Sequence, residues 1–482
     1  MVSSYSSELT LDRREEWPEV THQVIQKDRY RLLFWLAVFC LSIAGFAANA
    51  YISWRFFEAR AYRSYDTIFD ADPNFHYAYL VGLRGTSIRH PLELLILHPL
   101  ALVASQLNSN LHLNATKWLV ILLGPLAGVL KTWLLAWALL RLKQNYRWVL
   151  LLVALDVFSF SRLTVGSLPE SFPLSAAAIT ALFLLGAIQA TSASFRRLTW
   201  IALGTCIAGI TVTNLAAFDC VLGWSLIQSG MTTKDSLRNV VVTTCQIAIA
   251  VGALYGASIL LFHARPMSYL LPDLSYRAQQ AEGAVPPAIS DRLSTGLVQP
   301  PSPSSTGANP KSSTVRFFHF QPVYELRNLP LVDTYAFAGP TPKVVPIERT
   351  NPTAYPTAWE RSAPPFGFVM DESWSIAWAL PLSIFTAALI TGTFGWFRLG
   401  WQNQFAIAAL MVLAFNAALH SIWGADELYL YVSHWQPALL ILLSGGAFVK
   451  RRYPAVLLCG LLLTEIFLNT QNLQFMLTRL SK

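Results

Sequence analysis

The sequence predicts an all-α polytopic membrane protein with about 11 transmembrane helices. Of its 482 residues, 54% are apolar and only 13% are charged, against roughly 25% charged residues in an average soluble domain. Apolar runs long enough to cross a bilayer recur along the chain. The 35 Lys and Arg residues fall in short clusters between these runs, so they indicate membrane orientation and not a nucleic-acid partner.

The apolar runs define eleven candidate spans, some of them shorter than the roughly 20 residues of a straight crossing. The first run begins behind a charged leader and is too long and too far from the start for a signal peptide, so we expect it to remain as an anchor. The spans cover approximately residues 32–54, 118–140, 148–163, 171–190, 199–212, 214–229, 240–262, 374–396, 405–423, 434–449 and 454–470.

The positive-inside rule orients these spans. With eleven crossings and a cytoplasmic N-terminus, all the basic loops share the cytoplasmic side; they lie at 141–147, 196–197, 234–238, Arg398 and 450–452. The apolar segment 90–107 would invert every later loop if it crossed the membrane. We therefore expect it to form helices that lie in or dip into the outer interface.

Four regions follow from this topology. They are a cytoplasmic tail (1–31), a seven-helix membrane module (32–262) that includes an external loop (55–117), an external Pro-rich region (263–373) and a four-helix membrane module (374–482). Within the Pro-rich region, the apolar patches 317–324 and 363–370 are expected to fold against the membrane domain.

Five cysteines lie inside apolar stretches, without the spacing of a metal site. We expect them to be small apolar packing residues. They are Cys40, Cys206, Cys220, Cys245 and Cys459.

An unusual group of acids follows the first span, in "YDTIFDADPNFHY" (65–77). Asp66, Asp70 and Asp72 stand among apolar and aromatic residues that can seat the segment on the membrane. A carboxylate held there suits proton abstraction from a water-soluble hydroxyl that attacks a lipid-borne electrophile. These three aspartates are the candidate catalytic residues.

Further candidate binding residues lie on the same expected side. Cations in the first external loop could bind a phosphate or, alternatively, lipid headgroups; they are Arg84, Arg89, His90 and His98. The two histidines have no third ligand at a suitable spacing for zinc. We predict no metal site from residue spacing.

Glu170 opens a span after Pro169, where it could favour the helix N-terminus or bind substrate. The stretch "WGADELYLYVSHW" (423–435) contains Asp426, Glu427 and His434 among aromatics, as in an interfacial aromatic belt or a sugar-binding rim.

Two aspartates, Asp156 and Asp219, lie in apolar surroundings, where an unpaired charge is costly. Each should face the bundle interior or a wet cavity. Lys131, inside the second span, is a plausible partner for one of them, and the sequence does not say which.

The topology resembles that of the GT-C fold glycosyltransferases, and within them the protein mannosyltransferase and lipid A aminoarabinose transferase branch. The shared features are the aspartates that open the first external loop, the interfacial helices after them, and a large external loop between spans seven and eight. Locally, "FDAD" (69–72) resembles the acidic motif of that family's first loop, and "LPESFPLS" (168–175) is similar to its Pro-Glu element.

The resemblance implies transfer of a sugar, with inversion, from a polyprenyl-phosphate donor to a lipid, glycan or protein acceptor on the external side. Asp72 or Asp70 would act as general base, with Asp66 in reserve. The other aspartate would orient the base or bind a divalent cation, Mg²⁺ or Mn²⁺. No other cofactor is expected, and we favour a bacterial inner membrane as the location.

Three other functions fit part of the sequence. A transporter or lipid-carrier flippase would use acids within the spans, at mid-membrane and in discontinuous helices. A non-catalytic envelope protein could recruit partners through its Pro-rich loop. An O-antigen ligase or polymerase would share the lipid carrier, but it gives no reason for aspartates directly after span one.

Overall fold

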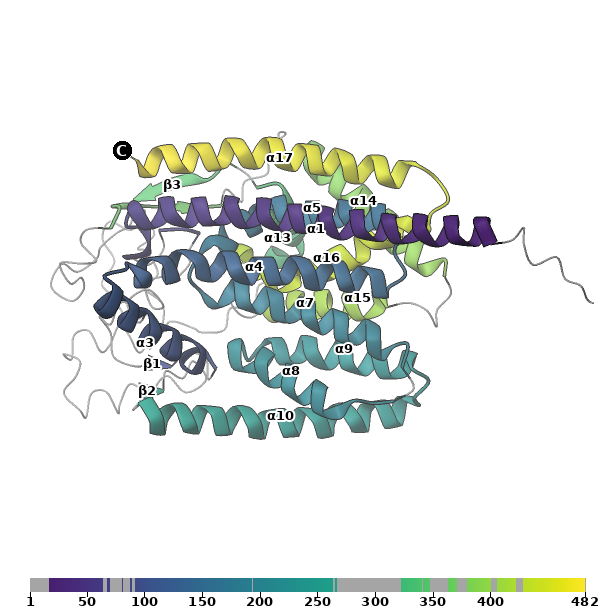
Figure 1. Cartoon of the computed structure of the whole chain (residues 1–482), viewed down its shortest axis with the longest axis horizontal. Coiled ribbons are helices and arrows are strands. Elements are labelled where there is room, and N and C mark those ends of the chain that lie inside the picture. The colour runs from purple at the N-terminus through teal and green to yellow at the C-terminus, as the bar shows by residue number, and fades with distance from the viewer. Residues whose placement is uncertain are drawn as a thin grey trace, which may run out of the picture.

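The computed structural model is built mainly from helices that run along one common axis (Figure 1). It describes residues 17–63, 67–69, 80, 87–88, 92–192, 194–262, 265–266, 322–339, 341–346, 363–370, 379–399, 405–421 and 428–481. Within these ranges, six helices are long and apolar enough to cross a membrane. They are α1 (Trp17–Glu58), α4 (Ala115–Arg141), α7 (Ser171–Gln189), α10 (Thr233–Phe262), α14 (Ala379–Phe397) and α17 (Tyr453–Leu480). The chain is therefore an all-α, multi-pass membrane protein.

Shorter helices occupy the other expected spans. They are α5 (Tyr146–Phe158), α6 (Phe160–Leu163), α8 (Arg197–Ile210), α9 (Asn214–Gln228), α15 (Ala406–His420) and α16 (Leu428–Ser444). The helices α5 and α6, with the short turn η2 (Val165–Ser167), pass the same test as one span bent by 50°. Another short turn, η7 (Gly445–Phe448), follows α16.

Ser159 explains the break between α5 and α6. Its backbone is extended, with ψ of 144°, so it cannot continue the helix. The Ser159 hydroxyl donates to the Asp156 carbonyl at 2.7 Å and accepts from the Arg162 backbone N–H at 3.3 Å. One side chain thus satisfies backbone groups on both sides of the break, as a cap does.

Helix α3 (Glu93–Leu111) forms part of the first long connection and lies obliquely at one end of the bundle (Figure 1). It packs on α4, and the Leu92 backbone N–H just before it donates to the Gly209 carbonyl of α8 at 3.0 Å. Whether α3 lies in the membrane interface, as expected from the sequence, stays a prediction.

The second long connection packs into the bundle through α13 (Pro322–Phe337). Residues 331–339 are all buried, and α13 contacts α6, α14, α15 and α16. Two short strands, β3 (Lys343–Pro346) and β4 (Phe366–Val369), pair in antiparallel fashion. The apolar patch 363–370 therefore folds against the rest of the chain as expected, with Phe368 fully buried. A separate parallel pair joins β1 (Ser87–Ile88) to β2 (Arg265–Pro266).

The expectation that the cysteines are packing residues is wrong for four of the five. Cys40, Cys206, Cys245 and Cys459 are exposed, and Cys220 is half-buried. Lipid is as apolar as a protein core, so an apolar residue on a membrane helix can face outward.

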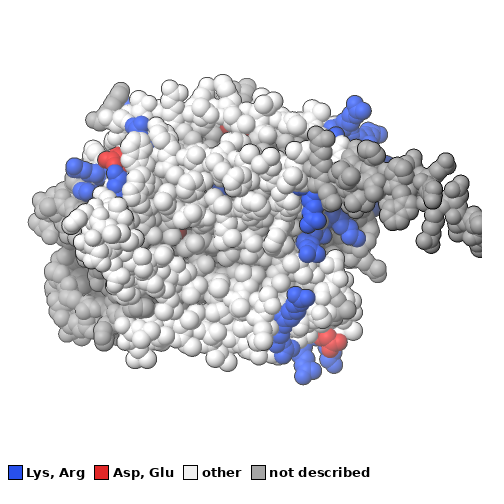
Figure 2. Space-filling view, in the orientation of Figure 1, with Lys and Arg blue, Asp and Glu red and all other residues white. Residues whose placement is uncertain are grey.

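Lys and Arg residues gather at the end of the bundle where α1 starts, and a smaller group lies at the opposite end (Figure 2). Of the acids expected to line that opposite end, Glu170 alone is described, and it is 3% exposed. The others lie outside the described residues.

Candidate functional site

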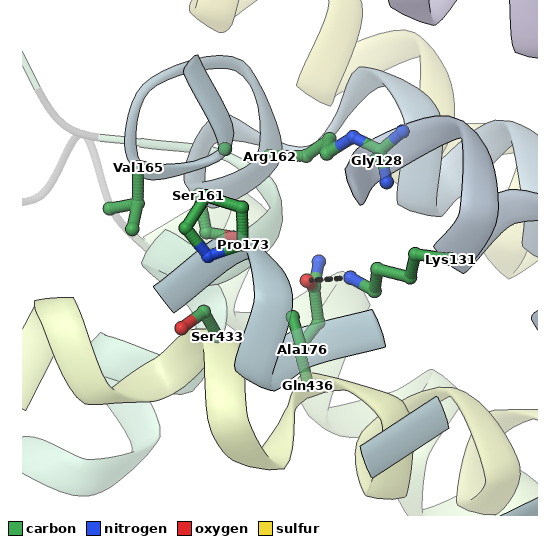
Figure 3. Close-up of a pocket in the computed structure, with 10 residues that line it drawn as sticks. Gly128, Lys131, Ser161, Arg162, Val165, Pro173, Ala176, Ser433 and Gln436 are labelled. Atoms are coloured by element: carbon green, nitrogen blue, oxygen red, sulfur yellow. Dashed lines mark hydrogen bonds between the residues drawn. The ribbon is translucent and has the colours of Figure 1, made fainter. Parts of the chain in front are cut away.

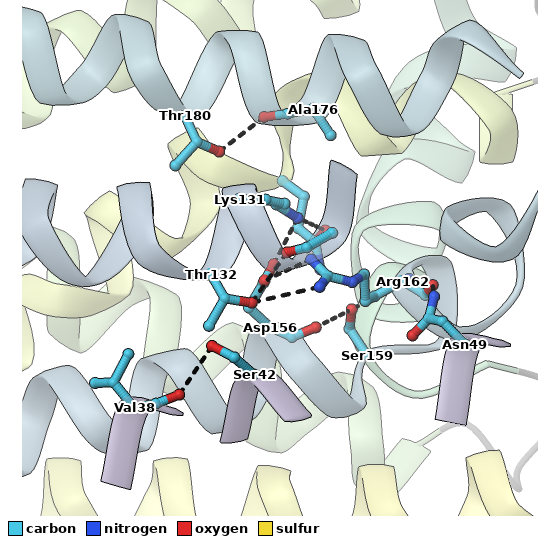
Figure 4. Close-up of polar contacts among 12 residues, drawn as sticks. Val38, Ser42, Asn49, Lys131, Thr132, Asp156, Ser159, Arg162, Ala176 and Thr180 are labelled. Atoms are coloured by element: carbon cyan, nitrogen blue, oxygen red, sulfur yellow. Dashed lines mark hydrogen bonds and ion pairs between the residues drawn. The ribbon is translucent and has the colours of Figure 1, made fainter. Parts of the chain in front are cut away.

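Three charged side chains meet inside the bundle, and we call them the buried charge cluster: Lys131 of α4, Asp156 of α5 and Arg162 of α6 (Figure 4). The Lys131 Nζ lies 2.5 Å from Asp156 Oδ1, and the Arg162 Nη1 lies 3.4 Å from Asp156 Oδ2. None of the three side chains is more than 3% exposed. The partner of Lys131 is therefore Asp156; the other candidate, Asp219, accepts a hydrogen bond from Thr244 at 2.6 Å.

The break at Ser159 places Arg162 where it can reach this cluster. The Arg162 Nη2 donates to Thr132 Oγ1 at 3.3 Å, and the Arg162 carbonyl accepts from Asn49 Nδ2 of α1 at 2.6 Å. The guanidinium passes directly over Gly128, where any Cβ would collide with it. Contacts from three helices, α1, α4 and α5, thus hold the buried arginine of α6.

Lys131 also donates to Gln436 Oε1 of α16 at 2.8 Å (Figure 3). Beside these groups lies a cavity of about 20 Å³, which is enough for one water molecule. Its lining comprises Gly128, Lys131, Ser161, Arg162, Val165, Gly166, Pro173, Ala176, Ser433 and Gln436.

The cluster lies deep in the bundle. At 1.5 Å per helical residue, Asp156 and Lys131 are each about 15 Å along their helices from the basic turn at 141–147. The hydrocarbon core of a bilayer is about 30 Å thick. The distance of the cluster from that turn is therefore about half the thickness of the core.

Glu465 of α17 is a further buried acid near the cluster. It is fully buried and interacts unfavourably with the charge of Asp156. Within the part of the chain that the structure describes, neither carboxyl oxygen of Glu465 has a hydrogen-bond partner.

The first long connection is anchored close to α6 by Phe69. Its ring contacts the rings of Phe160 and Tyr429, with centroids 5.7 and 5.1 Å apart. Its backbone N–H donates to the Phe368 carbonyl at 2.8 Å, and its φ of 51° is in the left-handed region, which is uncommon for a bulky residue. Phe69 is the residue immediately before Asp70.

Most of the predicted site residues lie outside the described residues. These are Asp66, Asp70, Asp72, Arg84, Arg89, His90, Asp426 and Glu427. Among the remaining three, His98 is half-buried on α3, while Glu170 and His434 are each 3% exposed.

The structure brings the surroundings of Glu170 and His434 together. Glu170 immediately precedes α7, and the ring of Phe172, two residues on, lies 5.4 Å from the His434 ring. Glu170 also lines a second small cavity with residues of α3, α4 and α8. His434, however, is not on an exposed rim, because α16 begins at Leu428 and carries the imidazole into the interior. The stretch 423–435, expected as an interfacial belt or a sugar-binding rim, is helical from Leu428 onward.

Sequence reasoning missed Arg162, Gln436 and Glu465. The sequence places Arg162 at the end of an expected span and Glu465 inside another. A charge within an apolar run is itself a signal of a functional or paired group. No sequence pattern singles out Gln436. Among the described residues, no group of three metal-ligating side chains occurs.

Comparisons with protein-family models, curated proteins and solved structures found no match to this chain.

Proposed function

We propose that the chain is an integral membrane glycosyltransferase. It transfers a sugar, with inversion, from a polyprenyl-phosphate donor to an acceptor on the external side of a bacterial inner membrane. It crosses the membrane eleven times from a cytoplasmic N-terminus. Asp72 or Asp70 is the general base, and Asp66 is the reserve candidate.

The observation that supports this proposal best is the position of Phe69. The residue just before Asp70 is seated on Phe160 and Tyr429, and Phe160 opens the short helix that carries Arg162. Its left-handed backbone is the kind of local strain that clusters at active sites. The chain thus enters the acidic motif from a fixed point beside the helix that carries Arg162.

In this mechanism the phosphate is already a good leaving group, so catalysis needs a base for the acceptor hydroxyl and positive charge around the phosphate. Arg84, Arg89, His90 and His98 are the proposed phosphate ligands. The acid that is not the base orients it or holds Mg²⁺ or Mn²⁺.

Glu170, Asp426, Glu427 and His434 are proposed to contact the substrates. The burial of His434 limits it to a group that enters the bundle.

The test is an in vitro assay of the purified protein with a panel of polyprenyl-phosphate sugars, following release of the lipid phosphate. Asp70→Asn and Asp72→Asn should each lower the rate, with at least 100-fold loss for the base, because general base catalysis contributes about 10²–10⁴-fold. Asp235→Asn is the matched control: Asp235 is exposed in the first turn of α10 and bonds Thr232. Near-normal activity in both first-loop variants would remove the assignment.

The eleven-span topology has its own test. After replacement of the native cysteines, Lys143→Cys and His112→Cys place single thiols just beyond the two ends of α4. A membrane-impermeant maleimide added to intact cells should label the cysteine at 112 and not the one at 143. Labelling of both positions from one side would reject this orientation.

A transporter or lipid-carrier flippase is the second candidate, and the buried charge cluster favours it specifically. Charged groups at mid-membrane on a broken helix are typical of transport pathways, and the α5–α6 break bears Arg162. In proteoliposomes a flippase would lose lipid translocation on Asp156→Asn but keep it in Asp70→Asn. The transferase proposal expects Asp70→Asn or Asp72→Asn to abolish product formation.

A further inference from the structure

Three residues that line the cavity beside the buried charge cluster carry polar atoms without a partner among the described residues. They are Arg162 Nε, Gln436 Nε2 and Ser161 Oγ. All three residues are at most 4% exposed. A buried donor without a partner costs about 1–3 kcal/mol, so three such groups around one cavity indicate a missing ligand.

The orientation of the Gln436 amide follows from chemistry. Lys131 can only donate, so the amide atom that faces it at 2.8 Å must be the oxygen. The amide nitrogen is therefore directed elsewhere, and it is a donor. Arg162 Nε is likewise a donor only. The ligand must accept hydrogen bonds.

The net charge of the cluster also favours a ligand that is an anion. Two cations, Lys131 and Arg162, share one carboxylate, Asp156. One positive charge is left over in an interior where an uncompensated ion costs several kcal/mol. Glu465 could supply a negative charge, but both its oxygens are without donors in the part of the chain described.

The size of the cavity selects among anions. About 20 Å³ holds a particle the size of one water molecule. So small a volume favours a monatomic anion over a phosphate or a carboxylate group, each of which has several heavy atoms. A water molecule would fit but would leave the excess charge in place.

We propose that this cavity binds a single halide ion, chloride under physiological conditions. Arg162 Nε, Gln436 Nε2 and the Ser161 hydroxyl donate to the ion. The ion neutralises the leftover positive charge and fixes the broken α5–α6 span against α4 and α16. The proposal is independent of whether the protein is a transferase or a transporter.

The experiment measures the melting temperature of the full-length protein in detergent, in sodium chloride and in sodium gluconate at equal ionic strength. Chloride should raise the melting temperature in a saturable way, and a concentration 100 times its Kd should raise the ratio of folded to unfolded protein about 100-fold. Gln436→Leu should abolish the difference between the two salts. Crystals exchanged into bromide should show an anomalous peak in the cavity.

Gln144→Leu is the matched control. Gln144 is a buried glutamine outside the cavity lining whose amide atoms also have no partner among the described residues. Its variant should keep the full chloride effect even if its stability changes. Equal melting temperatures of the wild type in the two salts would overturn the proposal. So would a chloride effect that survives in Gln436→Leu, or one that appears only in Glu465→Gln.

Discussion

Asp156 holds the two buried cations together, and its removal should cost more than removal of either one. Asp156→Asn leaves Lys131 and Arg162 as two buried positive charges, whereas Lys131→Met leaves a neutral Asp156–Arg162 pair. Breaking a buried ion pair costs about 3–5 kcal/mol. We expect a loss in that range for Asp156→Asn and a smaller one for Lys131→Met, measured as the free energy of unfolding in mixed micelles.

Asp219, a second acid within an apolar helix, provides the control for Asp156→Asn and Lys131→Met. Asp219 bonds Thr244 and is half-buried, and Asn can keep this bond, so Asp219→Asn should change stability by less than about 1 kcal/mol. If Lys131→Met were as damaging as Asp156→Asn, the charge argument for the cluster would be wrong.

Gly128 gives a test of how tightly the arginine is held. An added Cβ would collide with the Arg162 guanidinium, and overpacking of this kind costs about 1–3 kcal/mol. Gly128→Ala should therefore destabilise the protein. In contrast, Gly252 of α10 has no neighbouring atom within 4 Å of the position a Cβ would take, so Gly252→Ala should stabilise it by about 0.5–1 kcal/mol. Unfolding of the two variants side by side separates the local collision from general helix propensity.

The sequence could name Lys131 and Asp156 as buried charges, because they interrupt apolar runs. It could not choose between Asp156 and Asp219 as the partner, since that choice depends on how α4 and α5 face each other. The sequence did not identify Arg162 as a buried charge for a related reason. Only the break at Ser159 turns a residue at a span's end into the interior.

At the scale of elements, Asn469 of α17 joins the second long connection to the broken span. Its Oδ1 accepts from the Gly339 backbone N–H at 2.9 Å, and its Nδ2 donates to the carbonyls of Phe158 and Phe337 at 2.9 and 2.7 Å. Phe158 ends α5 and Phe337 ends α13. One amide therefore joins the ends of two helices, α5 and α13.

Asn469→Ala removes all three bonds and leaves buried backbone groups unpaired, at about 1–3 kcal/mol for each group. We expect a clear loss of unfolding free energy and, under the proposed function, slower transfer, because the end of α13 would no longer be tied to the end of α5. Thr470→Ala, at an exposed neighbour bonded within its own helix, should stay within about 0.5 kcal/mol of the wild type. An Asn469→Ala variant as stable as Thr470→Ala would contradict this role.

Helix positions were largely predictable because bilayer-length apolar runs leave few alternatives. The bounds of α4 and α7 lie within a few residues of the expected spans. The start of α16 was missed by several residues, since "LYLYVSHW" mixes aliphatic, aromatic and polar residues and is typical of an interface. Only packing against α7 and α15 shows that Tyr429, Trp435 and His434 are interior.

At the scale of the whole molecule, the buried carboxyl of Asp333 should make the free energy of unfolding depend on pH. It lies on α13 in the second long connection, where burial raises the pKa of its carboxyl to about 7 despite a hydrogen bond from Trp435. In the unfolded chain the pKa is about 3.9. Folding therefore favours the protonated acid, and its contribution to stability, complete below about pH 4, is lost as pH rises to 7.

Melting temperatures from pH 5 to 8 test this sign by comparison with Asp333→Asn. The wild type should lose stability relative to the variant between pH 5 and 7, by at most tenfold in the folding equilibrium per pH unit, and the difference should level off above pH 7. Parallel pH profiles for the two proteins would mean that Asp333 is ionised in the folded state.

The pairing of Phe69 with Phe368 joins segments made at very different times. At about 5–20 residues per second, the ribosome needs roughly 15–60 s to travel from one to the other. During that interval the aspartates of the first loop have already left the ribosome, while the strand that holds the preceding residues does not yet exist. A nascent or prematurely terminated chain thus carries the whole acidic motif without its fixed point, and under the proposed function activity should appear only once synthesis has passed β4.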